Sequence, residues 1–296
     1  MTPTKHVVFL GLAAILVLLV LLPAAALAGR ARERGEFDLV RDFATPFTME
    51  AISLVLGTPV GDPEEMERLE RWSTSYADIT SGYLHAKMED VVQLGEYFRV
   101  HVAARGGTPS DDLIGAFMRD GGLDDEEDVI IQCMMAFAAG RVTTQKLLAD
   151  GIPLLMPEWD AWRKMVRTTP SMLRRLIEEL LRVVTPTRYV ARYAAEDVQL
   201  DDDDAAGVHI RRGERVILIL EAANRDGDAF PAPHALQADR QPNPHVAFGF
   251  GVHRCGQQSL PAFQPVAANA VAGNRIDQRG RCAGRSSPAS AARCAC

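Results

Sequence analysis

Apolar positions recur every three or four residues over long stretches of the chain, which is the spacing of one buried face on an α-helix. Gly57 and Pro59 end the first of these stretches, and Asp111 and Asp112 precede a later one as a helix cap. The predicted helices cover residues 35–59 (a loop and then a helix), 63–79, 91–107, 111–122, 123–156 and 171–184. The fifth helix opens with acidic residues, which favour the positive end of the helix dipole.

The pattern changes after the last predicted helix. Residues 189–200 and 208–220 alternate or carry β-branched side chains, and Gly213 marks a turn between strands. The acidic run 201–204 predicts a solvated loop rather than a metal site, because adjacent acids cannot all face one ion. An irregular stretch follows over 223–245, and long loops of this kind usually carry function. The predicted fold class is mainly α with a small β-sheet.

The first 28 residues differ from the rest of the chain. Residues 7–28 form an uncharged apolar run that is long enough for a membrane-spanning helix. The run also fits a signal peptide, because Ala26 and Ala28 form a small-x-small cleavage pattern before Gly29. A buried helix, or a stretch translated in the wrong frame, is the alternative. We therefore expect three parts: a hydrophobic leader (anchor, signal or artefact) over 1–28, a globular domain over 29–258, and a tail over 259–296 without stable structure.

Composition narrows the possible functions. Apolar residues make up 47% of the 296 positions and charged residues 24%, as in an ordinary globular protein. The formal net charge of −7 argues against non-specific nucleic-acid binding, so we expect no nucleic-acid partner. The five cysteines are an odd number and three crowd the tail, which does not predict a disulfide framework.

The segment FGFGVHRCGQQ, residues 248–258, carries the strongest chemical signal. A lone cysteine is most often a small buried hydrophobe. Here Gly249 and Gly251 permit tight turns, and backbone N–H groups in such a turn can lower the pKa of a thiol. A zinc site would need more ligands nearby than the sequence supplies, and a catalytic cysteine–histidine pair would need an oxyanion-hole pattern. The residues alone therefore disfavour a zinc site and a catalytic cysteine–histidine pair without excluding either.

Residues 248–255 resemble the haem-binding loop of the cytochromes P-450, a family of haem-thiolate monooxygenases. The resemblance implies a partial cytochrome P-450 fold over residues 36–258, of the bacterial type. It implies haem b as cofactor, with Cys255 as the axial thiolate and Phe248, Gly249 and Gly251 shaping the loop. Glu179 and Arg182 match the family's Glu-x-x-Arg pair, and Arg240 matches the arginine that joins it; a buried network of this kind needs all its partners.

Further site residues follow from the same resemblance. Gly140 and Thr143 match the family's oxygen-binding stretch, where the glycine leaves room for dioxygen and the threonine positions a water. Taken without the resemblance, these are small residues suited to helix packing. Val142 replaces the family's usual acid, so that Arg141 or a chain of waters would have to serve the proton relay. Arg192 and His253 match the positions that hold the haem propionates.

The resemblance implies a monooxygenase that inserts one oxygen atom of O2 into a small organic substrate, using electrons from a ferredoxin- or flavoprotein-type donor. It implies a cytoplasmic location, or membrane association if residues 7–28 form a real helix. The chain departs from the family before residue 36 and after Cys255, where Gly256 follows directly. We therefore expect a chain truncated at both ends, with a tail that a frame change could produce. The alternative function is an inactive fragment with weak or no haem binding.

Overall fold

The computed structural model describes residues 37–59, 61–80, 87–108, 110–120, 125–200 and 207–255, together with Leu27, Gly29 and Glu33. The helices are α2 (Thr45–Leu56), α3 (Pro63–Thr80), α4 (Met88–Ala103), α5 (Leu113–Asp120), α6 (Glu126–Leu155), α7 (Trp159–Thr168), α8 (Ser171–Val184) and α9 (Leu220–Ala223). The strands are β1 (Val190–Tyr193), β2 (Val198–Leu200), β3 (Val208–Ile210) and β4 (Arg215–Leu218). A π-helical turn covers Leu39–Ala44, and 3-10 turns cover Met156–Glu158 and Gly251–His253.

The helix boundaries follow the capping signals of the sequence. α2 ends at Gly57, whose φ of 77° is the left-handed conformation that favours glycine. Asp112 precedes α5 and accepts the Gly115 N–H at 2.8 Å. Asp125 caps α6 in the same way, accepting the Asp128 N–H at 2.9 Å. The prediction of these helix ends is confirmed.

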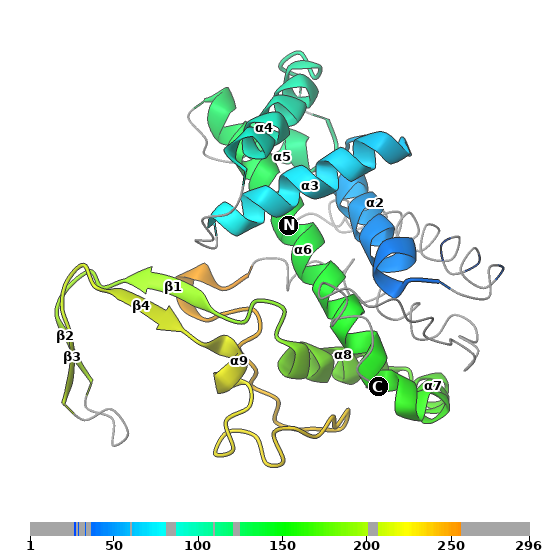
Figure 1. Cartoon of the computed structure of the whole chain (residues 1–296), viewed down its shortest axis with the longest axis vertical. Coiled ribbons are helices and arrows are strands. Elements are labelled where there is room, and N and C mark those ends of the chain that lie inside the picture. The colour runs from blue at the N-terminus through cyan, green and yellow to red at the C-terminus, as the bar shows by residue number, and fades with distance from the viewer. Residues whose placement is uncertain are drawn as a thin grey trace, which may run out of the picture.

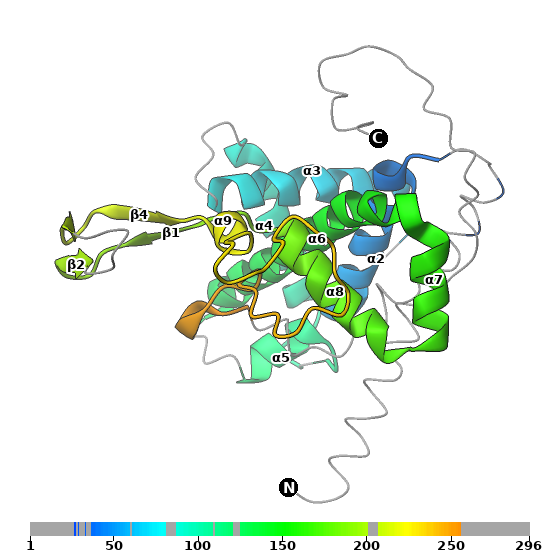
Figure 2. The same ribbon diagram turned by 90° about the horizontal axis from the view of Figure 1, so that it is seen from below.

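α6 runs through the centre of the molecule and is contacted by α2, α3, α4, α5 and α8 (Figures 1 and 2). Its first half supplies Ile130, Cys133 and Phe137 to a core shared with α2–α5, and each of these side chains is fully buried. Its second half packs Leu148 and Ile152 against a cluster that includes Phe43, Phe47 and Leu27. α6 therefore connects the packing of the whole helical body.

The helix α7 was not predicted from the sequence. It carries Trp159, Trp162 and Val166 at helical spacing, and these side chains pack in a second core with α8. Pro157 lies in the 3-10 turn between α6 and α7, so the chain changes direction there. The same core includes Ala247, from the segment that leads to Cys255.

The β region forms two antiparallel sheets of two strands each, where the sequence predicts one. β1 pairs with β4, with Ala191 opposite Ile217, and β2 pairs with β3, with Gln199 opposite His209. Each long run of strand-like sequence breaks at a turn. The turn between β1 and β2 lies against the turn between β3 and β4. Asp197 of the first turn accepts the Arg212 N–H of the second at 2.8 Å, next to Gly213, whose φ is 85°.

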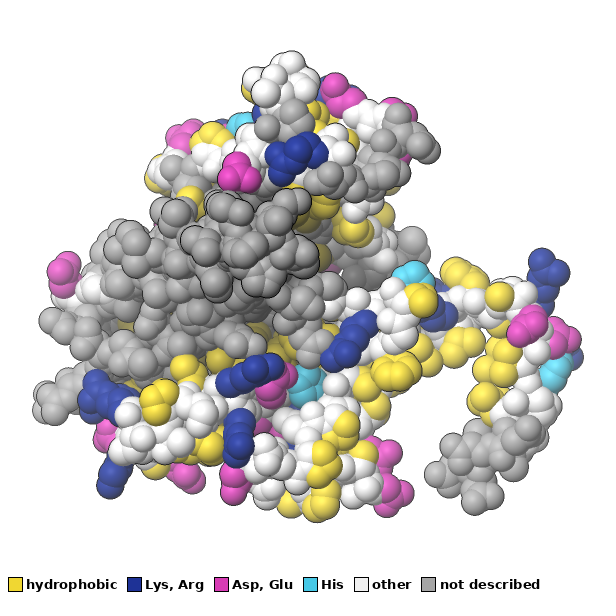
Figure 3. Space-filling view, turned by 180° about the vertical axis from the view of Figure 1, so that it is seen from behind, with side chains coloured by type: hydrophobic (Ala, Val, Ile, Leu, Met, Phe, Trp, Pro, Cys, Tyr) yellow, Lys and Arg dark blue, Asp and Glu magenta, His cyan; other side chains and the backbone are white. Residues whose placement is uncertain are grey.

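The strands project from the helical body as a narrow arm (Figure 2). Apolar side chains are exposed along this arm (Figure 3). Tyr193 is 71% exposed and Ile219 is 50% exposed. The predicted leader lies outside the described residues apart from Leu27. Among the helices that the structure describes, none is long and apolar enough to cross a membrane. The tail after residue 258 and the acidic run 201–204 also lie outside the described part.

Candidate functional site

Glu179 lies at the centre of a buried charge network on α8. Arg182 donates to its carboxylate from Nε at 2.9 Å and from Nη2 at 2.8 Å. The Arg240 Nε approaches both carboxylate oxygens, at 3.0 and 3.2 Å. The Gln237 N–H and the Asn243 amide donate at 3.1 and 3.2 Å. The structure thus brings together Glu179, Arg182 and Arg240, with the side chains of the first two fully buried.

The network keeps its carboxylate charged. Burial alone would raise the pKa of Glu179, but hydrogen bonds from Arg182, Gln237 and Arg240 outweigh it, so that its pKa lies below the ordinary value. The Arg182 guanidinium also lies 5.1 Å from the centre of the Phe230 ring. It donates further to the carbonyls of Asn224, Pro233 and Ala235, at 2.8, 2.8 and 3.0 Å. The irregular segment after α9 is therefore fastened to α8 by charge-assisted hydrogen bonds.

Asn224 joins the same helix to the cysteine loop, which we define as residues 245–255. Its Nδ2 donates to Thr185 Oγ1 at 2.9 Å, and its Oδ1 accepts the Val246 N–H at 2.7 Å. Asn224 is fully buried. No sequence pattern predicted a role for this residue. An asparagine a few residues after the predicted strand 208–220 was the only available signal.

The cysteine loop ends in a tight turn around Cys255. The Cys255 N–H donates to the Phe248 carbonyl at 2.9 Å, which closes the loop. Gly249 and Gly251 have φ values of 71° and 73°, where other residues are strained. In Figure 1 this segment, coloured orange, lies on the opposite side of α6 from α2. The two glycines therefore have the conformational role that the sequence predicts for them.

The loop carries a free thiol and exposed apolar side chains. Cys255 is a free cysteine of intermediate exposure, so its thiol is not sealed in a core. Beside it in sequence, Phe250 and Val252 are 88% and 98% exposed. A Cβ added at Gly251 would meet no atom within 4 Å, so the space above the turn is open. A free thiol that is not sealed in a core is the kind of donor that a haem-thiolate site requires.

α6 carries Gly140 and Thr143, and the Thr143 hydroxyl donates to the Ala139 carbonyl at 2.8 Å. Arg141 is turned the other way. It is 1% exposed and donates to Ser73 and Thr74 of α3 at 2.8 and 2.6 Å. Residues two positions apart in sequence lie about 200° apart around a helix, so the side chains of Arg141 and Thr143 point to different sides of α6. The suggestion that Arg141 substitutes for the missing acid is wrong, since its guanidinium is fixed between α3 and α6.

Arg192 and His253 are both exposed, on β1 and in the 3-10 turn before Cys255. The Arg192 Nη1 donates to the Ala191 carbonyl at 2.8 Å. No hydrogen bond joins Arg192 to His253 among the described residues. Their assignment to the haem propionates stays a prediction.

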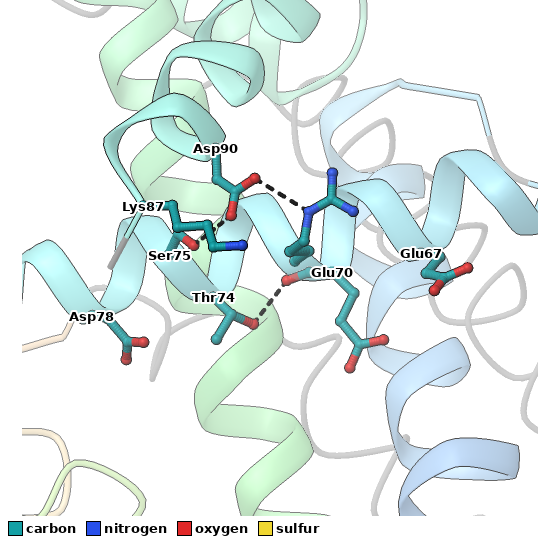
Figure 4. A pocket seen from close by; sticks show the side chains of 8 residues that line it. Glu67, Glu70, Thr74, Ser75, Asp78, Lys87 and Asp90 are labelled. Carbon is teal, nitrogen blue, oxygen red and sulfur yellow. Dashed lines mark hydrogen bonds and ion pairs between the residues drawn. The ribbon is translucent and has the colours of Figure 1, made fainter. Parts of the chain in front are cut away.

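A polar hollow of about 400 Å³ lies between α3 and α4 (Figure 4). At its edge Asp90 accepts from Arg71 Nε at 3.2 Å and from Ser75 Oγ at 2.9 Å. The lining is mostly charged and contains no residue of α6, α8 or the cysteine loop. A substrate pocket is usually apolar with few polar groups, so we interpret this hollow as a gap between two packed helices and not as a substrate site. Within the described residues, no group of three His, Cys, Asp or Glu side chains is placed to hold a metal ion.

Relatives of known sequence place these features in a family. Residues 156–258 match the family described as Cytochrome P-450. The chain is 31% identical over 231 residues to a steroid C26-monooxygenase of Mycobacterium tuberculosis, covering 75% of this chain and 60% of that protein. It is 31% identical over 243 residues to the biotin biosynthesis cytochrome P-450 of Bacillus subtilis, covering 78% and 58%. The chain thus spans about 60% of the length of these curated relatives.

Solved structures agree with the sequence relatives. The LnmA cytochrome P-450 hydroxylase of Streptomyces atroolivaceus superposes with a TM-score of 0.71 at 31% identity, covering 92% of this chain and 72% of that one. The cytochrome P-450 BioI, solved in complex with an acyl carrier protein, gives a TM-score of 0.74 at 28% identity, covering 92% and 68%. With this fold, with the Glu179 network beneath it and with a cysteine loop of matching sequence, the chain belongs to the cytochrome P-450 family.

Proposed function

We propose that the chain is a haem-dependent monooxygenase that inserts one oxygen atom of O2 into an organic substrate. One observation carries the proposal: the segment that leads into the cysteine loop is tied to α8 through Glu179, Arg182 and Arg240. A fully partnered buried charge network is costly to assemble and gives the segment one conformation. The family membership supports haem as the group that this segment serves.

Cys255 would hold the haem iron through its thiolate, and its own N–H donates to the Phe248 carbonyl. Gly249 and Gly251 adopt positive φ and carry no side chain, so a planar group could approach the sulfur closely. The bound haem b would supply the oxygen-activating and electron-transfer chemistry. The protein's own part is to orient the thiolate and to shield it with Phe248 and the apolar residues of the loop.

Gly140 and Thr143 are proposed to lie where dioxygen and its proton-delivering water bind. The Thr143 hydroxyl already donates to Ala139, so its oxygen is free to accept from a water. With Val142 in place of an acid and Arg141 engaged by α3, a chain of waters is the proposed proton path. Arg192 and His253 are proposed to hold the propionates through charge-assisted hydrogen bonds.

The proposed substrate is a small apolar organic molecule. The named relatives include a steroid C26-monooxygenase and a structure with hexadec-9Z-enoic acid on its carrier protein, and both names refer to long or wide aliphatic skeletons. The proposed electron donor is a ferredoxin or a flavoprotein. Titration of the haem-loaded chain with a steroid and with a free long-chain fatty acid, followed by absorbance, would separate the two skeletons.

Absorption of the reduced chain with carbon monoxide tests the proposal, after incubation with haem. A strongly red-shifted Soret band is expected from the wild type and from Cys133→Ala, since Cys133 lies in the core and burial raises its pKa to about 12. Cys255→Ser should lose the band. If folded wild-type protein gives no such band, the chain is the inactive fragment of the alternative prediction. An unchanged band in Cys255→Ser would remove the assigned ligand.

A further inference from the structure

A second acid of α8, Glu178, contacts the cysteine loop directly. The His245 Nε2 lies 2.9 Å from the Glu178 Oε2, and the His245 side chain is only 4% exposed. Glu178 is adjacent to Glu179 in sequence but faces the loop rather than the segment 231–243. The hydrogen bond from His245 is the largest cause that lowers the pKa of Glu178, with Arg174 and Arg254 adding to it. Glu178 is therefore charged and directed at one side of the imidazole.

The other ring nitrogen of His245 fixes its tautomer. The Ala247 N–H donates to the His245 Nδ1 at 3.3 Å, so Nδ1 must carry a lone pair. The proton of the neutral ring then belongs to Nε2, which donates it to Glu178. The ring centre lies 6.0 Å from that of Phe248. His245 thus links a charged residue of α8 to the backbone of the loop on the side of Phe248.

The backbone that His245 holds is the backbone that holds Cys255. The Gly249 N–H donates to the Val246 carbonyl at 2.8 Å, and the Cys255 N–H donates to the Phe248 carbonyl at 2.9 Å. Ala247, between Val246 and Phe248, is 8% exposed and packs in the core of α8. A shift of residues 245–247 would therefore be passed on through two hydrogen bonds to the sulfur.

We propose that His245, held by Glu178, is a positioning residue for the Cys255 thiol. The proposal rests on the proposed function, because it names the residue that aims the assigned ligand. His245 does not touch the iron or the substrate in this account. It acts through the backbone, by fixing the start of the loop in one place, as residues behind metal ligands commonly do.

The test compares three variants of the full chain, His245→Ala, Glu178→Ala and His245→Asn, with His209→Ala as the control. His209 also faces an acid, Asp197, at 3.9 Å, but on the strand arm. Two quantities are compared among the variants whose melting temperatures equal that of the wild type. The first is the rate at which iodoacetamide alkylates Cys255 in the haem-free chain, followed by peptide mass mapping. The second is the dissociation constant for haem.

Alkylation of Cys255 should change several-fold in His245→Ala and in Glu178→Ala, and haem binding should weaken by about tenfold. His245→Asn should recover part of both, because its amide oxygen can accept the Ala247 N–H. His209→Ala should match the wild type. Wild-type alkylation in both alanine variants would overturn the proposal, as would an equal effect in the control. If His245→Ala does not fold, Glu178→Ala decides. A wild type without a thiolate spectrum would contradict the proposed function, while the alkylation comparison still tests the positioning.

Discussion

Arg182 donates to both oxygens of Glu179, at 2.9 and 2.8 Å, and neither side chain is exposed to solvent. A bidentate pair of this kind has fixed geometry as well as charge attraction. Arg240 approaches the same carboxylate from a segment about sixty residues later in the chain. The pair therefore does more than stabilise α8, because it fixes the segment that leads to the cysteine loop.

Replacement of Glu179 by Gln should destabilise the chain strongly. The amide would leave two buried guanidinium groups without a counter-charge, and breaking a buried pair in this way costs about 3–5 kcal/mol. The free energy of unfolding in urea measures the loss. Glu96→Gln is the matched control, since Glu96 pairs with Arg99 on the exposed face of α4 and should show no measurable change. Equal stability of Glu179→Gln and the wild type would contradict the structural role of the network.

Stability should fall on acidification, and Glu179 should account for part of the slope. Its pKa in the folded chain is lowered, because its hydrogen bonds outweigh the effect of burial. The stabilising contribution is therefore complete above the ordinary pKa of 4.5 and is lost as the pH falls through the folded value. The free energy of unfolding, measured in urea at several pH values on both sides of 4.5, should depend less steeply on pH in Glu179→Gln than in the wild type. Glu64→Gln, at a side chain 87% exposed, should keep the wild-type slope.

The sequence predicted the helices well because their signals are local. Caps such as Asp112 and Gly57 act within one helical turn, so the ends of α2 and α5 could be assigned without knowledge of the fold. The family resemblance supplied the long-range contact of Glu179 with Arg240. Spacing alone could not have supplied it, since about sixty residues, with the strands and α9 among them, separate the two positions.

The contacts that were missed depend on how helices and coil pack together. Arg141 was expected near the reactive face of α6, but only the position of α3 shows that its guanidinium is directed to Ser73 and Thr74. Asn224 and His245 lie in or next to irregular backbone without periodicity, so no pattern indicated their partners on α8. Buried polar residues in coil are where tertiary structure adds most to sequence analysis.

Replacement of Arg141 should separate the cost of its volume from the cost of its charge. Its partners Ser73 and Thr74 also donate to carbonyls of α3, at 2.6 and 2.7 Å, so they keep a hydrogen bond without it. Arg141→Ala should lower the free energy of unfolding by about 3 kcal/mol, because it leaves a cavity. Arg141→Met fills that space without a buried charge and should stay within about 1 kcal/mol of the wild type. Equal losses in both variants would show that the hydrogen bonds dominate.

Gly57 and Gly95 should respond to alanine in opposite directions. At Gly57 the φ of 77° disfavours a side chain, and a Cβ would collide with the Asp112 carboxylate that caps α5. Gly57→Ala should therefore cost more than about 1 kcal/mol. In the middle of α4 a Cβ at Gly95 would meet only the Met134 side chain, with Sδ at 3.7 Å and Cε at 3.9 Å, which are ordinary contacts. Gly95→Ala should be neutral or stabilise by up to about 1 kcal/mol, and thermal melting of the two variants checks the contrast.

Val142 offers a test of the proposed proton path on α6. The side chain before Thr143 is an acid in most of the family, by resemblance, and here it is a half-buried valine. Val142→Asp would place a carboxyl group next to the Thr143 hydroxyl, where it can pass protons to a bound water. In the haem-loaded chain, the product formed per reducing equivalent should rise by at least about tenfold over that of Val142→Ala, which removes the valine without adding an acid. The gain should disappear when Thr143→Ala is combined with Val142→Asp. If Val142→Asp and Val142→Ala give the same ratio, the side chain at position 142 does not serve the proton path.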